Sequence, residues 1–185
     1  MAQLIDLPTN LPIPFDDGKC NHLKGMYLPN ITLNSTNDNK INLAELKGLN
    51  VLYFYPMTGR PDVELPEGWN EIPGARGCTP QSCSFRDNNQ VLTNLNAKVY
   101  GISSQSTAYQ KEMVERLHLP FEVLSDENLE LAKELNLPTL IVNDMTLIKR
   151  ITLICKDNKI VKVFYPVFPP DKNVDEVINW IENKS

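Results

Sequence analysis

A continuous apolar and aromatic run, Val51–Tyr55, narrows the fold of this chain more than any other feature. Such a run is typical of a strand that is buried on both faces, as parallel strands in α/β domains are. The segment that follows, Met57–Gly77, is rich in proline and glycine and must be a loop. Strand-to-helix loops usually have about two to six residues, and much longer ones are usually functional. We therefore expect a buried strand followed by a long functional loop.

Helical and strand patterns alternate along the rest of the chain. A short strand or hairpin arm is expected near Leu28–Leu33, followed by a helical turn at Leu43–Leu46. Further strands are expected at Lys98–Ile102, Phe121–Leu124, Ile151–Cys155 and Ile160–Tyr165. Helices are expected from an N-cap at Thr79 to about Asn96, from Ser106 to Pro120, from Ser125 to Asn136, and from Asn173 onwards. This order predicts an α/β domain with a central mixed sheet flanked by helices.

Length and charge limit the class of protein. The chain of 185 residues suits one domain. We expect an irregular N-terminal arm over residues 1–25 and one domain over 26–185, with an inserted loop at about 58–76. A formal charge of −5 disfavours nucleic acid as a partner. No apolar run approaches the ~20 residues of a membrane span, and the start lacks signal-peptide features, so we expect no membrane partner and a cytoplasmic location.

Cysteine usage indicates redox or metal chemistry. The four cysteines are Cys20, Cys78, Cys83 and Cys155, too few and too scattered for a secreted disulfide scaffold. The close pair Cys78 and Cys83 favours a redox or metal site, and composition alone does not choose between the two. Cys20 and His22 form a possible pair of zinc ligands, but no second pair stands at a suitable spacing. Cys155 alternates in an apolar strand, which predicts a core residue.

The position of Cys78 favours a reactive thiolate. It directly precedes the expected helix start, where unpaired N–H groups and the helix dipole stabilise an anion. Arg76 and Arg86 are nearby cations that would act in the same direction. The alternative is a buried structural thiol, although Cys78 has no apolar neighbour in the sequence.

Cys83 is the natural partner for a sulfenic acid formed on Cys78. Residues five apart in one continuous helix have Cα atoms roughly 9 Å apart. A disulfide needs less than about 7 Å. The pairing therefore predicts local unfolding around residues 76–84 on oxidation. If Cys83 is instead a small core residue, Cys20 or an external thiol would take its place.

Gly77–Asp87, together with Tyr53–Pro56, closely resembles the active-site region of peroxiredoxins, and the nearest match is the peroxiredoxin Q (bacterioferritin comigratory protein) group. The resemblance covers roughly residues 26–184 and implies a thioredoxin-like fold. It implies a thiol-dependent peroxidase that reduces hydrogen peroxide and alkyl hydroperoxides, with Cys78 as peroxidatic and Cys83 as resolving cysteine. Thioredoxin or a similar dithiol protein would restore the pair. The implied enzyme is a monomer or homodimer without cofactor or metal.

A second part of the resemblance is Arg150. Peroxiredoxins keep an arginine just before the strand that neighbours the catalytic cysteine, and Arg150 stands there. In that place it would hold the thiolate charged and polarise the peroxide O–O bond. Lys149 is a rival for this role, and a solvated strand-end cation is the plain alternative.

One departure from the family pattern concerns a proline and a Thr or Ser that the family places seven and three residues before its catalytic cysteine. Neither stands at those positions here. In one hypothesis, Pro56 and Thr58 are the start of the motif, split by the inserted loop, and Thr58 Oγ1 reaches Cys78. In the other, Pro73 supplies the proline and Thr79 the hydroxyl.

Two other functions are weighed against the peroxidase. A thiol–disulfide oxidoreductase is disfavoured because the motif is Cys-x4-Cys and not the Cys-x-x-Cys of thioredoxins. A redox sensor or interaction protein would use the disulfide to switch a binding surface without turnover. The inserted loop, with Trp69 beside acidic residues, would gate the substrate or meet a partner, or simply pack Trp69 on the domain.

Overall fold

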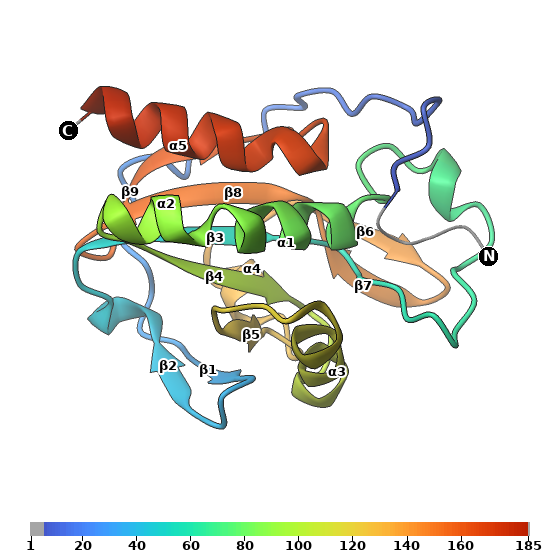
Figure 1. Ribbon diagram of the computed structural model, residues 1–185, viewed down its shortest axis with the longest axis horizontal. Helices are drawn as coiled ribbons and strands as arrows, with labels where there is room; N and C mark the ends of the chain where they lie inside the picture. The colour runs from blue at the N-terminus through green and yellow to red at the C-terminus, as the bar shows by residue number, and fades with distance from the viewer. Residues whose placement is uncertain (1–5, 185) are drawn as a thin grey trace.

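The computed structural model describes residues 6–184; residues 1–5 of the expected arm and Ser185 lie outside this range. Within it, seven strands form one sheet in the order β2-β1-β5-β4-β3-β8-β9 (Figure 1). They are β1 (Thr32–Ser35), β2 (Lys40–Asn42), β3 (Leu49–Phe54), β4 (Ala97–Ser103), β5 (Val123–Ser125), β8 (Ile151–Lys156) and β9 (Lys159–Phe164). Strands β3, β4 and β5 run parallel, and the other neighbouring pairs are antiparallel. The expected mixed sheet is thus confirmed.

Helices cover both faces of this sheet. They are α1 (Cys78–Asp87), α2 (Asn89–Asn94), α3 (Thr107–Leu117), α4 (Glu130–Glu134) and α5 (Asn173–Lys184), with 3-10 turns η1 (Leu43–Glu45), η2 (Trp69–Glu71) and η3 (Pro170–Lys172). Val51 and Tyr53 of β3 pack in a core with α1, α2, α3 and α5. Leu52 and Phe54 face the opposite way, into a core with α4 and the segment 20–28. The central strand is therefore buried on both faces, as its sequence predicts.

Several helix boundaries differ from the expectation. The helix expected to reach Asn96 breaks at Asn88 into α1 and α2. Ser106 caps α3, as predicted, by accepting from the Tyr109 N–H. Ser125 caps no helix, because its hydroxyl donates to the Gln105 carbonyl at 2.6 Å. The shorter α4 is held instead by the carboxylate of Asp126, which accepts two backbone N–H groups at the helix start.

A second, two-stranded sheet was not predicted from the sequence. Strands β6 (Thr139–Val142) and β7 (Met145–Ile148) form a hairpin beside the inserted loop, at the right of Figure 1. Trp69 of the loop is buried in a small cluster with Ala75, Val142 and Leu147. Trp69 therefore packs on the domain, which is the plainer of the two expectations for this loop.

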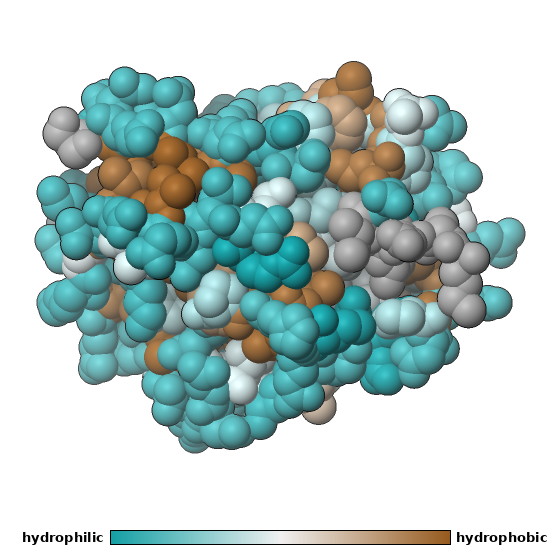
Figure 2. Space-filling model, in the orientation of Figure 1, coloured by the Kyte–Doolittle hydropathy of each residue, from teal (hydrophilic) through white to brown (hydrophobic). Residues whose placement is uncertain are grey.

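The N-terminal segment contains no helix or named strand between residues 6 and 25, and Cys20 and Leu23 are its buried residues. Cys20, expected in a flexible arm, is buried in the core that faces α4. The face of the molecule seen in Figure 1 is largely hydrophilic, and its apolar residues gather in small separate patches (Figure 2). None of the helices described has the length and apolar character that crossing a membrane requires.

Candidate active site

The start of α1 is set by Gly77 and not, as expected, by Thr79. Gly77 is the N-cap and has a left-handed backbone, with φ at +115°. A Cβ at this position would lie 2.6 Å from Cγ of Pro170, so only glycine fits. Cys78 is consequently the first helical residue and is buried. Its sulfur lies at the helix end where free N–H groups and the dipole favour an anion.

Arg150 meets Cys78 across 72 residues of sequence. Its Nη2 lies 3.2 Å from Cys78 Sγ, and the side chain is 4% exposed. Arg150 stands between β7 and β8, directly before the strand that pairs with β3. Lys149, its expected rival, forms an ion pair with Asp17 at 3.5 Å instead. A guanidinium this close to the sulfur and this well shielded from water interacts strongly with a thiolate.

The end of the inserted loop wraps around this guanidinium. Nη2 of Arg150 also lies 3.0–3.3 Å from the carbonyl oxygens of Gly74, Ala75 and Arg76. The Cys78 thiol donates weakly to the Ala75 carbonyl, at 3.7 Å. The loop thus delivers acceptor groups to Arg150 and holds its planar donors in one orientation.

Gln81 was not predicted from the sequence as a residue of the site. Its Oε1 accepts from Arg150 Nη1 at 2.6 Å, and its side chain is fully buried. A signal was present, because a residue three positions after Cys78 on a helix lies on the same face as Cys78. The other expected cations contact backbone or acids: Arg76 Nη2 is 3.4 Å from the Asp6 carbonyl, and Arg86 pairs with Asp87.

The two candidate threonines are placed differently. A pocket of about 10 Å³ at the thiol is lined by Met57, Gly59, Leu65, Trp69, Arg76, Gly77, Cys78 and Thr79. Thr58 is buried, but its hydroxyl lies 3.1 Å from Gln105 Oε1, and its N–H donates to the same oxygen. Thr79 thus lines the pocket at the thiol, whereas Thr58 is not among its lining residues.

Cys83 lies one and a half turns along α1 from Cys78 and is buried. Burial raises the pKa of its thiol, and the Arg86 guanidinium lowers it in part. Cys78 and Cys83 share the core on one face of the sheet, whereas Cys20 belongs to the core on the other. The folded structure therefore separates Cys20 from Cys78 by the sheet. His22 bonds through Nε2 to the Leu135 carbonyl, at 2.8 Å.

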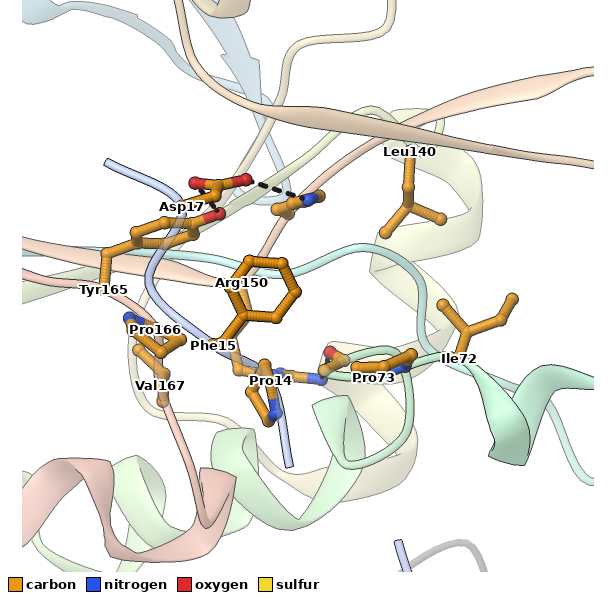
Figure 3. A pocket seen from close by; sticks show the side chains of 12 residues that line it. Pro14, Phe15, Asp17, Ile72, Pro73, Leu140, Arg150, Tyr165, Pro166 and Val167 are labelled. Atoms are coloured by element: carbon orange, nitrogen blue, oxygen red, sulfur yellow. Dashed lines mark hydrogen bonds and ion pairs between the residues drawn. The ribbon is translucent and has the colours of Figure 1, made fainter. Parts of the chain in front are cut away.

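A separate cavity of about 310 Å³ lies against Arg150 (Figure 3). Its walls come from the N-terminal segment, the inserted loop, β6 and residues 165–167, with Phe15, Ile72, Pro73, Leu140 and Val167 among the apolar groups. Asp17 joins Tyr165 and Lys149 at its polar side. Its lining includes Arg150 but not Cys78, so it is distinct from the pocket at the thiol.

Comparisons with known proteins show which family the chain resembles. The family model described as Redoxin matches residues 23–178. Peroxiredoxin Q, chloroplastic, of Triticum aestivum is 33% identical over 162 residues, covering 86% of this chain and 67% of that protein. Among solved structures, peroxidoxin BcpB from Mycobacterium tuberculosis superposes with a TM-score of 0.72 at 22% identity, covering 89% of this chain and 99% of that one. The Xanthomonas campestris bacterioferritin comigratory protein gives 0.65 at 16% identity, covering 95% and 99%.

The two structural likenesses show the fold, which is the thioredoxin-like fold of peroxiredoxins. The family match and the similarity in sequence go further, because they extend over most of the chain. This chain belongs to the redoxin family and, within it, to the peroxiredoxin Q group.

Proposed function

We propose that Cys78 is the peroxidatic cysteine of this thiol-dependent peroxidase. The observation that carries the proposal is the 3.2 Å contact between Arg150 Nη2 and Cys78 Sγ at the N-terminus of α1. Both the guanidinium and the helix end stabilise the thiolate, which is the nucleophilic form. The guanidinium also meets the negative charge that develops on the leaving oxygen of the peroxide.

The electrons in the proposed cycle pass through the two cysteines and an external dithiol reductant. The Cys78 thiolate attacks one peroxide oxygen, so that an S–O bond forms and the O–O bond breaks. Cys78 becomes a sulfenic acid, and the leaving alkoxide or hydroxide takes a proton from solvent. The Cys83 thiol then attacks the sulfenic sulfur, which gives a disulfide and releases water. A dithiol protein returns two electrons and two protons to that disulfide.

The resolving step requires α1 to open at its start. Cys78 and Cys83 lie in one continuous helix, where Cα atoms five residues apart are roughly 9 Å from each other. The local unfolding of residues 76–84 predicted above follows from this distance. Hydrogen exchange tests it: amides of this segment should exchange faster in the disulfide form. Equal protection in the reduced and oxidised forms would contradict the proposed pairing.

The substrates are proposed to be hydrogen peroxide and alkyl hydroperoxides. The bacterioferritin comigratory protein of Xanthomonas campestris is described as having alkyl peroxide reduction activity. For the present chain, the support is the small pocket at Cys78 and the family membership. Thioredoxin or a similar dithiol protein is the proposed reductant.

The first experiment measures NADPH consumption with hydrogen peroxide, thioredoxin and thioredoxin reductase. Cys78→Ser should abolish turnover, and Cys83→Ser should reduce it strongly. Cys155→Ser is the matched control, because Cys155 is buried in the core on the other face of the sheet and should leave turnover unchanged. Turnover that survives Cys78→Ser would overturn the assignment. If the wild type consumes no NADPH yet intact mass shows oxidised Cys78, thioredoxin is the wrong reductant.

Three further predictions from the sequence complete the proposal. We propose that residues 26–185 form the catalytic domain and residues 1–25 an arm, that the protein is a monomer or homodimer, and that it is cytoplasmic. The wheat relative is a chloroplastic protein, so the location needs its own measurement, by fluorescence microscopy of the tagged full chain. Light scattering after gel filtration measures the oligomeric state.

A further inference from the structure

A chain of buried polar side chains links Arg150 to the last helix. Gln81 Nε2 donates to Asn173 Oδ1 at 3.1 Å, and Thr152 Oγ1 donates to the same oxygen at 2.7 Å. Gln81, Thr152 and Asn173 are all fully buried. Asn173 was expected to cap α5, but η3 directly precedes that helix. The side chain of Asn173 bonds to Gln81 and Thr152 instead.

These hydrogen bonds run in a single direction. Arg150 only donates, so the amide of Gln81 must turn its oxygen to Arg150 and its nitrogen to Asn173. At the other end, Asn173 Nδ2 donates to the Glu176 carboxylate at 3.4 Å, and a carboxylate only accepts. Asn173 must therefore offer its oxygen to Gln81. Both ends of the chain impose the same orientation on Gln81.

The start of α5 and the turn η3 before it also pack against the first part of α1. Pro170 lies against Gly77, Ser84 Oγ donates to the Asp171 carbonyl at 2.8 Å, and Asn173 holds Gln81. These contacts cover the part of α1 that must open before Cys78 and Cys83 join. The proposed cycle needs a correctly oriented Arg150 guanidinium and a start of α1 that can unfold. Residues 170–173 contact the groups on which both depend.

We propose that Asn173 is a positioning residue that orients Gln81 and Arg150 toward Cys78 and delays the opening of α1. This rests on the proposed function, in which Cys78 reacts with peroxide and Cys83 resolves. Asn173 touches neither Cys78 nor substrate and acts through Gln81. Its loss should slow the first chemical step, because Arg150 is less well held, and should speed the second, because α1 opens more easily.

Opposite changes in two steps separate this role from a general loss of stability. Asn173→Ala removes the hydrogen bond that orients Gln81, together with those to Thr152 and Glu176. We expect the second-order rate of Cys78 oxidation to fall about three- to tenfold, which corresponds to the free energy of the one bond that orients Gln81. The rate of Cys78–Cys83 disulfide formation should rise about threefold or more. At high peroxide, less Cys78 should reach the sulfinic acid, because resolution competes better.

The oxidation step is measured by competition with horseradish peroxidase for hydrogen peroxide. The disulfide step is measured by rapid quenching with an alkylating reagent followed by intact mass. Ser84→Ala is the matched control, because it removes the hydrogen bond to the Asp171 carbonyl. It leaves the hydrogen bonds from Asn173 through Gln81 to Arg150 intact. It should speed disulfide formation and leave the oxidation rate within about twofold. If Asn173→Ala fails to fold, Thr152→Val replaces it, since this nearly isosteric change removes the donor to Asn173.

Three results would overturn the proposal. The first is that both rates stay at wild-type values in the Asn173 and Thr152 variants. The second is that both rates fall together. The third is that Ser84→Ala slows oxidation as much as Asn173→Ala does. Failure of the proposed function is a different result, because the wild type itself would then show no peroxide-dependent oxygen addition at Cys78.

Discussion

Cys78 and Arg150 show how much of the proposed chemistry depends on single side chains. The guanidinium reaches the sulfur of Cys78, three loop carbonyls and Gln81 together. The other three cysteines have no guanidinium within hydrogen-bonding distance among the residues described. Burial raises the pKa of Cys20 and Cys155 to about 12 and raises that of Cys83. A thiol whose pKa is near 12 is almost entirely protonated at neutral pH and is a poor nucleophile.

Alkylation should therefore be selective. In the folded protein near pH 7, iodoacetamide should modify Cys78 first and leave Cys20 and Cys155 unmodified while Cys78 reacts. Peptide mapping by mass spectrometry measures the order, and unfolding in urea serves as the control because all four thiols then become accessible. Modification of Cys20 or Cys155 ahead of Cys78 would contradict the assignment.

The roles of Thr58 and Thr79 can be distinguished by replacing each with valine in turn. Thr79 lines the pocket at Cys78. If its hydroxyl orients the peroxide, Thr79→Val should slow peroxide reduction about tenfold or more. Thr58→Val removes the hydrogen bond to Gln105, which directly precedes the N-cap of α3. If Thr79 supplies the hydroxyl, this change should alter the rate of peroxide reduction by about twofold at most. The reverse order of effects would return the role to Thr58.

Among the helices, α1 begins where backbone conformation permits and not where the best capping side chain stands. Thr79 and Pro80 have the sequence signature of a helix start, but Gly77 alone accepts the left-handed backbone beside Pro170. The helix thus starts two residues earlier than predicted from Thr79. That shift places Cys78 inside the first turn, next to the free N–H groups.

Gly77→Ala should reveal the cost of this arrangement. The new Cβ would clash with Pro170, and the alanine would have to adopt the left-handed φ of Gly77. We therefore expect the free energy of unfolding to fall by about 1–3 kcal/mol. Gly25→Ala is the control, because Gly25 also has a positive φ, +94°, but no atom within 4 Å of the added carbon. Urea unfolding of both variants separates the clash from the backbone strain. Equal losses would mean that Pro170 yields without cost.

For the domain as a unit, the inserted loop and the β6–β7 hairpin depend on each other. Trp69 of the loop packs with Val142 and Leu147 of the hairpin, and the same Trp69 lines the pocket at Cys78. Neither segment belongs to the main sheet. We therefore expect their joint cluster to hold the inserted loop on the domain.

Trp69→Ala should loosen this assembly. Removing a buried tryptophan costs about 3–5 kcal/mol where the site does not collapse. We expect lower stability in urea and faster proteolysis within residues 60–76. Val63→Ala in the same loop is the control, since Val63 is exposed and its truncation should change stability by less than about 0.5 kcal/mol. Unchanged proteolysis of the Trp69 variant would show that the cluster does not hold the loop.

Local sequence patterns predicted the order of the main strands and most helices, the burial of β3 on both faces, and Cys78 beside a helix start. These features depend on neighbours within a few residues, because apolar periodicity and cap chemistry act over one or two turns. The β6–β7 hairpin was missed. The caps expected at Ser125 and Asn173 were wrong because these side chains bond to partners distant in sequence. The cap expected at Thr79 was wrong because Gly77 accepts the left-handed backbone at the helix start. Resemblance to peroxiredoxins suggested Arg150, but its contacts with Gln81 and the loop carbonyls, and the link from Gln81 to Asn173, required the folded chain. Such contacts join residues about 70 to 90 positions apart, and only packing of the whole domain brings them within hydrogen-bond distance.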